Sequence, residues 1–399
     1  PSWKCTTLSA LSLTNHIIGT MSSHASVCVQ SSAILGARGR HASPANTATR
    51  VTGELRRYAH GSKHTRFTSR KTASRGHNRL LTVSQAVSTE APAVTFPEFL
   101  PTEVEDFEDP IARAFAARVQ RVPVETSVAS PVGGSLGVSC VAPLNRVPLV
   151  GQSAEGASDK TQFMFLHGFD SSCLEFRRLF PMMEAQGLEA WAVDLLGWGF
   201  TDMPEGIDYS PAAKRQVLYD FWKQYINKPM VLMGGSIGGA LAIDFAVEHP
   251  DAVEKLILVD PQVFATLPPP PDKPPALPAP LGYMGAAVLK SIPLRWFATY
   301  QVFKNKAEAS RDAIRVGRLH CLQDNWAMAL VEYMGCGGPV LLQRDVSEKL
   351  PLIKQDTLLV WGEQDEILDR SNLELVLESV KSAPVTVEYI DRCGHQPHV

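Results

Sequence analysis

The chain has 399 residues, and its hydrophobic content of 45% can fill a sizeable core, which excludes a disordered or fibrous protein. The net charge of −3 hides a division. The segment up to Thr89 holds twelve basic residues and one acid, Glu54, whereas the remainder holds 26 basic and 40 acidic residues. An acidic globular part lacks the clustered positive charge that nucleic acid requires, so we expect no nucleic-acid partner.

Residues 1–89 have the composition of a targeting segment. From Met21 to Thr89 the chain is rich in Ser, Thr, Ala and Arg and shows no apolar periodicity that could bury a core, so we expect it to be unfolded. This composition resembles an organelle transit peptide, and the Met-Ser-Ser start at Met21 resembles a chloroplast one; a mitochondrial presequence and a plain basic tail are the alternatives. A transit peptide would engage the import machinery of the organelle. Residues 1–20 precede the methionine, and we expect an upstream or fragmentary origin for them.

Residues 90–120 are predicted to be a linker followed by a short helix. The stretch from Glu98 to Asp109 is acidic and is flanked by Pro97 and Pro110, which is typical of a linker. A helical pattern follows over residues 111–119 and leads into the folded part.

Six short apolar runs bounded by turn residues predict strands over residues 163–166, 190–193, 230–233, 256–259, 358–361 and 385–390. Nearly continuous apolar runs suit strands that are buried on both faces of a parallel sheet. Helical periodicity separates several of them, as over residues 217–225 and 241–247. This order predicts a mostly parallel, doubly wound α/β sheet, with the core divided between residues 121–261 and residues 350–399.

Residues 262–349 contain no convincing strand and predict a helical cap. A proline-rich run, residues 268–280, leads into helical patterns with five aromatic residues: Trp296, Phe297, Tyr300, Trp326 and Tyr333. An insertion at this point would lie over the carboxyl edge of the sheet, where α/β sites occur. The alternative is that these aromatic side chains belong to ordinary packing helices.

The sequence predicts neither a membrane-spanning helix nor a metal site. The most apolar stretch, residues 282–303, is interrupted by Lys290, Pro293 and Arg295 and does not reach the roughly eighteen residues that a span requires. The seven cysteines show no C-x-x-C pair, and no His cluster has zinc spacing, so we expect reduced thiols and no structural metal.

The nucleophile is predicted at Ser236. The pattern G-x-S-x-G from Gly234 to Gly238 lies between a predicted strand and a helical pattern, and a serine at such a sharp turn needs small neighbours because side chains there would collide. The same pattern surrounds Ser135, but a strand-like run, residues 138–141, follows it. We therefore expect a loop or hairpin turn at Ser135 and favour Ser236.

A serine hydroxyl needs an imidazole to accept its proton and a carboxylate to orient that imidazole. Three acids follow the predicted strand over residues 358–361: Glu363, Asp365 and Glu366. His395 follows the last predicted strand and a glycine, which gives the chain order Ser, acid, His that accompanies such a turn. Asp260, at the end of another strand, is the alternative acid, and His398 is the alternative base.

The run from Phe165 to Asp170 is a predicted strand that enters a turn of small residues, and it suits an oxyanion hole. A tetrahedral intermediate needs donors for its developing negative oxygen, and the backbone N–H groups of Phe169 and Ile237 can supply two. His167 in this run is predicted to be a structural turn residue.

These motifs resemble the α/β-hydrolase superfamily in its cap-bearing branch, and the plastid-targeted members of plants and algae in particular. The resemblance covers about residues 122–399 and rests on five segments: Leu166-His-Gly-Phe, Asp194-Leu-Leu-Gly-Trp-Gly-Phe-Thr-Asp202, Gly234-Gly-Ser-Ile-Gly238, Trp361-Gly-Glu-Gln-Asp365 and Gly394-His395. It implies Ser236 as nucleophile, Asp365 as acid and His395 as base, in an enzyme without a cofactor. Family members continue into a further helix, so we expect the chain to be truncated after Val399.

Three functions fit these residues. The favoured one is a serine hydrolase that cleaves an ester or related acyl bond of a small apolar molecule through an acyl-enzyme. A carbon–carbon bond hydrolase or lyase with the same triad is the second. A ligand-sensing binding protein with vestigial activity is the third, since a fold alone does not decide activity. Serine at the nucleophile position disfavours the alkyl-enzyme chemistry of epoxide hydrolases and dehalogenases, which the resemblance associates with aspartate.

Overall fold

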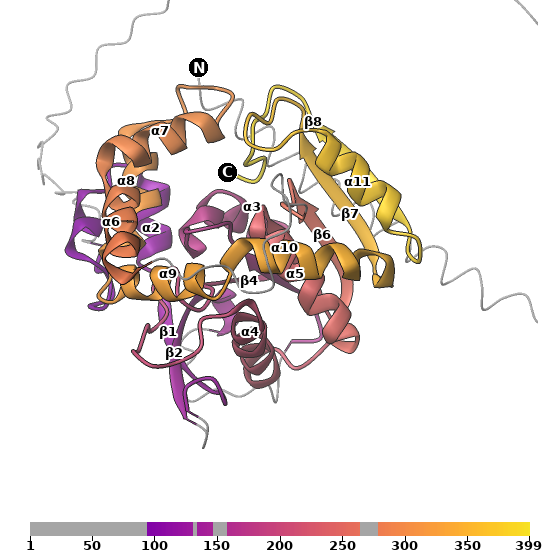
Figure 1. Cartoon of the computed structure of the whole chain (residues 1–399), viewed down its shortest axis with the longest axis horizontal. Helices are drawn as coiled ribbons and strands as arrows, with labels where there is room; N and C mark the ends of the chain where they lie inside the picture. Colours follow the sequence, from indigo (N-terminus) through magenta and orange to yellow (C-terminus); the bar gives the residue numbers. More distant parts are fainter. Residues whose placement is uncertain (1–93, 131–133, 147–157, 264–277) are drawn as a thin grey trace, which may run out of the picture. The chain divides into compact units, whose positions relative to one another are not determined.

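The computed structural model describes residues 94–130, 134–146, 158–263 and 278–399, so the predicted transit peptide lies outside the described residues. Within these residues eight strands form one sheet in the order β1-β2-β4-β3-β5-β6-β7-β8 (Figure 1). The strands are β1 (Gln120–Glu125), β2 (Ser135–Val141), β3 (Gln162–Leu166), β4 (Glu189–Val193), β5 (Met230–Gly235), β6 (Val253–Val259), β7 (Asp356–Gly362) and β8 (Val385–Ile390). All six predicted strands are confirmed.

The sheet is mostly parallel. Strands β3 to β8 pair in parallel, whereas β1 and β2 pair with each other, and β2 with β4, in antiparallel fashion. The predicted α/β class is therefore confirmed. Strand β2 begins at Ser135, which pairs with Glu125, so the described part of the second G-x-S-x-G copy enters an antiparallel strand instead of an α-helix.

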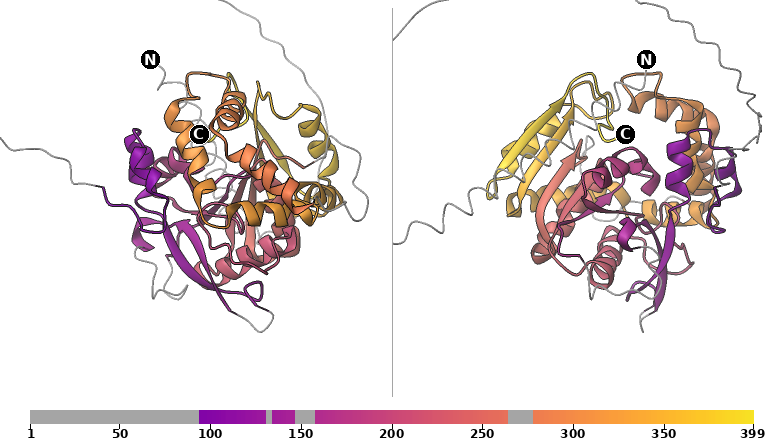
Figure 2. Two further views of the ribbon diagram at one scale, coloured as in Figure 1. Left: turned by 60° about the vertical axis from the view of Figure 1, so that its left-hand side comes forward. Right: turned by 180° about the vertical axis from the view of Figure 1, so that it is seen from behind.

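Both faces of the sheet are covered, and this explains the continuous apolar runs. On β3, Phe163 and Phe165 belong to the core on one face and Met164 and Leu166 to the core on the other. The first core is completed by helices and short 3-10 helices before β4: η1 (Thr102–Asp106), α2 (Pro110–Ala116), η3 (Cys173–Arg177) and α3 (Leu179–Ala185). The second is completed by α4 (Pro211–Tyr225), α5 (Ile237–Glu248), α10 (Gly338–Lys349) and α11 (Ser371–Ser379). The two panels of Figure 2 show these helices on either side of the strands.

The prediction of a linker within residues 90–120 is corrected by the structure, because much of this segment packs against the core. Leu100, Val104, Phe107 and Phe115 are buried and join the core that contains Phe163 and Phe165. The high content of proline and acidic residues suggested a linker, although η1 and α2 each carry apolar side chains that are buried. The short predicted helix is present as α2, with the Asp109 carboxylate accepting from the Ile111 N–H at its start.

The described part of the chain between β6 and β7 contains helices joined by loops and no strand. Besides α10, it contains α6 (Ala279–Lys290), α7 (Ile292–Val302), α8 (Arg311–Leu319), η5 (His320–Leu322) and α9 (Trp326–Gly335). Helix α6 packs on α9 and α7 on α8, whereas α10 packs on α5 in the core. We therefore propose that the cap ends before Gly338 rather than at residue 349. Figure 1 shows α6, α7 and α8 together, in orange.

Two expectations about the whole chain can be checked in the described part. No helix there has the length and apolar character needed to cross a bilayer. Cys140, Cys173, Cys321, Cys336 and Cys393 all carry free thiols. Three short 3-10 helices complete the described elements: η2 (Leu144–Arg146), η4 (Pro250–Ala252) and η6 (Leu350–Leu352).

Candidate active site

Ser236 occupies a strained turn between β5 and α5. Its φ of 52° and ψ of −122° lie in a region that L-residues rarely adopt. Two flanking glycines permit the turn: a Cβ on Gly234 would lie 2.2 Å from the carbonyl oxygen of Gly238, and a Cβ on Gly238 would lie 2.4 Å from that of His167. The side chain of Ser236 is partly exposed between buried neighbours and makes no hydrogen bond to another described residue. The turn thus presents a free hydroxyl at the sheet edge.

The turn that follows β3 lies against this serine. A Cβ built on Gly168 would lie 3.5 Å from the Cβ of Ser236, so the two turns are in van der Waals range. Within the described part of the chain, the N–H groups of Phe169 and Ile237 have no hydrogen-bond acceptor. Two unpaired donors next to one hydroxyl are the components of an anion-binding pocket.

Asp365 and His395 form the acid–imidazole pair that the sequence predicted. The Nδ1 of His395 lies 2.7 Å from Oδ2 of Asp365, and both side chains are nearly inaccessible to solvent. The other carboxylate oxygen accepts from the N–H groups of Ile367 and Leu368 at 2.7 and 3.0 Å, which fixes its orientation. A hydrogen on Nδ1 leaves Nε2 of His395 as the basic nitrogen.

The loop that carries His395 is held from two sides. The His395 N–H donates to the carbonyl of Val302, at the end of α7, over 2.9 Å. Gly394 lies so close to the ends of β7 and α7 that a Cβ on it would lie 2.3 Å from that same carbonyl oxygen. The position of the imidazole therefore depends on both the core and the cap. No hydrogen bond joins Ser236 to His395 within the described residues; such contacts are often long without substrate.

The alternative acid, Asp260, lies beside this pair but does not orient it. Its Oδ1 accepts from the N–H of Gly362 at 2.9 Å, and its buried Oδ2 has no partner among the described residues. Burial, together with the nearby Asp365 carboxylate, raises the pKa of Asp260 well above its usual range. Oxygen and nitrogen atoms of Asp260, Asp365 and His395 lie within 4.8 Å of one another, which would suit a cation, but the last two groups already bind each other.

The alternative base, His398, is engaged elsewhere. Its Nε2 lies 2.8 Å from Oε1 of Glu175, and the pair is buried next to Gly235, whose Cβ would lie 3.2 Å from the imidazole. Burial alone would raise the pKa of Glu175, but the hydrogen bond from His398 outweighs it and lowers this pKa to about 2. Because Oε2 of Glu175 accepts from the Gly168 N–H, the pair supports the turn after β3.

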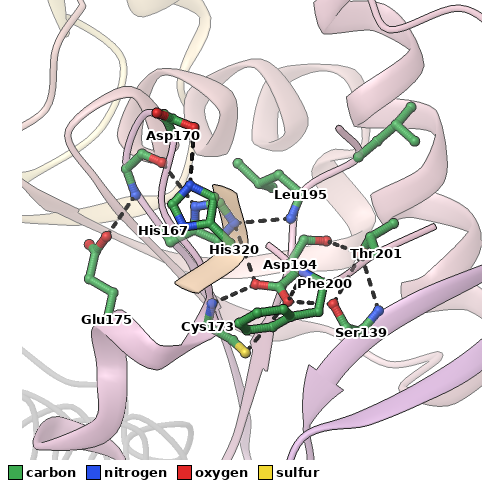
Figure 3. A network of polar contacts seen from close by, with 12 residues as sticks. Ser139, His167, Asp170, Cys173, Glu175, Asp194, Leu195, Phe200, Thr201 and His320 are labelled. Atoms are coloured by element: carbon green, nitrogen blue, oxygen red, sulfur yellow. Dashed lines mark hydrogen bonds and ion pairs between the residues drawn. The ribbon is translucent and has the colours of Figure 1, made fainter. Parts of the chain in front are cut away.

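His167 is structural, as predicted. It is fully buried, its Nε2 accepts from the Leu195 N–H at 3.1 Å, and its Nδ1 donates to the Gly168 carbonyl at 2.9 Å (Figure 3). Asp194 beside it accepts from Ser139 and from the N–H groups of Cys173 and Phe200. This network joins the ends of β2, β3 and β4 and holds the turn that contains Phe169.

Asp170 connects the same turn to the cap. Its carboxylate accepts from Nε2 of His320 at 3.0 Å, from Nε1 of Trp326 at 2.9 Å and from the guanidinium of Arg295. Burial raises the pKa of Asp170, but these donors outweigh it and lower the pKa below its usual range. Ligand atoms of Asp170, His320 and Cys321 lie within 4.8 Å of one another, and the Arg295 guanidinium contacts both the Asp170 carboxylate and, at 2.8 Å, the Cys321 sulfur.

Sequence reasoning did not identify the Asp170 cluster. Asp170 stands in the F-L-H-G-F-D run, but its partners lie at least 125 residues away, and no local pattern pairs them. Its positive φ of 49° was not visible either. The available signal was an acid with no assigned role directly after the predicted oxyanion turn.

Of the five cap aromatics, Trp326 and Tyr333 are buried, which fits the alternative that they are packing residues.

A cavity of about 170 Å³ adjoins the proposed oxyanion turn. It borders Phe169 and also Gln396, the neighbour of His395. Its other walls include Val302 and Phe303 from the end of α7 and Val316 from α8. A larger cavity of about 330 Å³ lies near Glu108 and Arg178 and touches none of the candidate catalytic residues.

Comparison with known proteins decides the family. The family described as Serine aminopeptidase, S33, matches residues 157–399, more than half of the chain. The α/β hydrolase domain-containing protein VTE7 of Arabidopsis thaliana is 37% identical over 305 residues, covering 76% of this chain and 86% of the plant protein. The chain belongs to the α/β-hydrolase superfamily of serine hydrolases. The predicted family is confirmed.

Other members of this superfamily show its range. Lipase 1 of Psychrobacter immobilis is 24% identical over 249 residues, covering 59% of this chain and 71% of the lipase. The solved structure of a meta-cleavage product hydrolase from Pseudomonas fluorescens covers 70% of this chain and 92% of its own, with a TM-score of 0.51 at 16% identity. At such identity the structural match establishes the α/β-hydrolase fold alone. The superfamily includes lipases, esterases and carbon–carbon bond hydrolases.

Proposed function

We propose that this chain is a serine hydrolase that cleaves an ester or related acyl bond through Ser236, His395 and Asp365. The observation that carries the proposal is the 2.7 Å contact between Asp365 and His395, at the same sheet edge as the strained Ser236 turn. Strands β5, β6, β7 and β8 are consecutive and parallel, so their carboxyl ends meet at this edge.

In the proposed reaction Ser236 Oγ attacks the acyl carbon while Nε2 of His395 accepts its proton. The carbonyl π electrons move to oxygen, and the N–H groups of Phe169 and Ile237 stabilise the resulting anion. When the tetrahedral intermediate collapses, the bond to the leaving group breaks and His395 returns the proton to that group. Water, deprotonated by His395, then attacks the acyl carbon; the bond to Ser236 Oγ breaks, the acid product leaves and His395 returns the proton to Oγ. Asp365 holds the imidazole tautomer and stabilises the imidazolium.

The contacts favour these residues over the alternatives. Asp365 bonds the imidazole directly, whereas Asp260 bonds a backbone N–H, and burial raises its pKa well above the usual range. The Nε2 of His398 is bound to Glu175, and the Nδ1 of His398 is buried without a partner among the described residues. Neither nitrogen of His398 is therefore placed to act as the base.

We propose a small apolar acyl compound as the substrate class. Part of the wall of the cavity beside the oxyanion turn is formed by Phe169, Val302, Phe303 and Val316, which can hold an apolar group. The wall also contains polar and charged residues, including Arg177 and Arg295, so it can hold the polar end of an acyl compound. The similarity to Lipase 1 of Psychrobacter immobilis supports an ester bond rather than another acyl bond.

Hydrolysis of a short acyl ester by the full chain tests this proposal. We expect Ser236→Ala to abolish turnover and Ser135→Ala, the matched change in the second G-x-S-x-G copy, to leave it unchanged. Unchanged turnover in Ser236→Ala would refute the proposal. Cleavage of a diketone but of no ester would instead indicate carbon–carbon bond chemistry, and ligand-induced melting shifts without turnover would indicate a binding protein.

We propose that the segment up to Thr89 directs the protein to a plastid. Its many basic residues and single acid, together with the similarity to a plant protein, support this localisation. A reporter fused to residues 1–90 should accumulate in chloroplasts of a plant cell. Accumulation in mitochondria or the cytosol would contradict the proposal.

A further inference from the structure

The two consecutive cap helices α6 and α7 expose an unusual amount of apolar surface. Only Ala286 is buried on α6, and no residue of α7 is buried. Half of the exposed large hydrophobic side chains in the described part of the chain lie on these two helices: Leu281, Tyr283, Met284, Val288, Ile292, Trp296 and Phe297. Apolar side chains gathered in this way mark an interaction surface. We call these seven residues the α6–α7 face.

The exposure follows the helical period, so the side chains on each helix share one side. On α6, Leu281, Met284 and Val288 recur at i, i+3 and i+7, while Gly282 and Ala286 face inward, Gly282 against Val331 of α9. On α7, Ile292 and Trp296 are four residues apart. Helix α6 therefore contacts the rest of the cap through Gly282, Ala286 and the partly buried Leu289, and α7 contacts the core through Arg295, while both helices direct large apolar side chains outward.

Positive charge accompanies the α6–α7 face. No acidic residue occurs between Asp272 and Glu308, whereas five basic residues do. Lys290 ends α6 and lies beside Arg318 of α8, whose Nε donates to the Lys290 carbonyl; neither side chain forms an ion pair with a described residue. Lys304 and Lys306 share the single carboxylate of Glu366. The surface around the face is thus basic, in a chain whose part beyond Thr89 is acidic.

The inner side of α7 reaches the candidate active site. Ala298, Thr299 and Val302 line the 170 Å³ cavity that also borders Phe169, and Arg295 binds Asp170 of the oxyanion turn. One helix therefore has an exposed apolar outer side and an inner side that walls the cavity. This step rests on the proposed function, because it takes that cavity as the substrate site.

We propose that the α6–α7 face docks on a lipid surface that contains anionic headgroups. Exposed tryptophan, tyrosine and aliphatic side chains next to lysine are typical of helices that lie in a bilayer interface. Anionic headgroups attract the surrounding basic residues. A second copy of this chain fits less well, since a two-fold interface would bring two predominantly basic surfaces together. Docking places α7, and the cavity that it walls, at the bilayer surface.

Vesicle cosedimentation of the full chain tests the proposal, with Ser236→Ala as background so that no lipid is turned over. We expect binding to phosphatidylcholine vesicles with about one third phosphatidylglycerol and weaker binding to phosphatidylcholine alone. Replacing Met284, Trp296 and Phe297 together by Gln should weaken binding about tenfold or more. In the matched control Gln replaces Leu144, Leu352 and Leu375, which are exposed on other elements. This control variant should bind vesicles like the parent.

Two further measurements keep the outcomes distinct. In the wild-type background, both triple variants should melt like the parent and hydrolyse a soluble ester like the parent, which shows that only docking has changed. Lys290→Glu with Arg318→Glu should remove the preference for phosphatidylglycerol.

Equal binding by the two triple variants, or no vesicle binding by the parent, would overturn the proposal. The proposal would also be overturned if the parent and the control variant were dimers and the Met284, Trp296 and Phe297 variant were a monomer. Absent ester hydrolysis with normal vesicle binding would count against the proposed function alone.

Discussion

His320 lies buried between the sheet and the cap, and its charge ties protein stability to pH. Burial alone would lower the pKa of this imidazole, but Cys321 and the hydrogen bond to Asp170 outweigh it and raise the pKa to about 9. The folded protein therefore keeps this proton at pH values where the unfolded chain, with an ordinary histidine pKa of 6.5, has lost it. Stability from this group is complete below the unfolded value and is lost as pH rises through the folded one.

The two pKa values set the size of the effect. The difference between about 9 and 6.5 corresponds to about 3 kcal/mol of unfolding free energy. His320→Gln removes the proton from both states. The destabilisation that it causes should therefore be about 3 kcal/mol larger near pH 6 than near pH 10.

The assay is urea unfolding of the wild type and of His320→Gln across this pH range. The difference between the two proteins is the informative quantity, because Lys214 titrates in the same range with the opposite sign. Burial lowers the pKa of Lys214 to about 7, so stability from this group increases as pH rises from about 7 towards 10.5. Subtraction cancels that contribution.

His249→Gln is the matched control. Burial lowers the pKa of His249, so as pH rises the folded protein loses this proton before the unfolded chain does. His249 therefore adds stability as pH rises, and the pH dependence that His249→Gln removes should have the opposite sign to that removed by His320→Gln. A destabilisation by His320→Gln that does not change with pH would refute the reasoning, because it would mean that His320 is neutral in the folded protein.

Further variants test the site, the turn and the buried acid. Asp365→Asn should lower kcat for ester hydrolysis about 10⁴-fold, whereas Asp260→Asn should retain most activity, as steady-state kinetics can check. Gly238→Ala should cost about 3 kcal/mol in urea unfolding because its Cβ would meet carbonyl oxygens at 2.4 and 2.5 Å, whereas Gly285→Ala, with open space in a helix, should be neutral or stabilising. The folded pKa of about 2 at Glu175 predicts that about 3 kcal/mol of stability present above its ordinary pKa of 4.5 is lost as pH falls towards 2, and that Glu175→Gln removes this loss.

Features with a local physical signature could be predicted from the sequence. Each strand buried on both faces is a continuous apolar run, as at residues 230–233, and the turn at Ser236 needs glycine at fixed offsets, since Cβ atoms there would overlap backbone. Chain order and strand ends favoured His395 as the base and left Glu363, Asp365 and Glu366 as acids, and the family resemblance then singled out Asp365. These signals require no knowledge of distant contacts.

Features that depend on distant partners could not be predicted. Residues 94–119 have the proline and acid content of a linker, and only the sheet face that receives Leu100 and Phe107 shows that they are packed. The pairing of Asp170 with His320 joins residues 150 positions apart. The exposure of Trp296 and Phe297 is likewise decided by what the rest of the fold leaves uncovered, whereas the aromatic content of this segment predicted either a cap over the site or packing helices.

Mapping the site of a fluorophosphonate adduct tests the nucleophile most directly, because such a probe reacts with an activated serine whatever the substrate. Mass spectrometry of the labelled, digested full chain should place one adduct on the peptide that contains Ser236. Labelling should disappear in Ser236→Ala and persist in Ser135→Ala. An adduct on another residue, or labelling that survives in Ser236→Ala, would contradict the account.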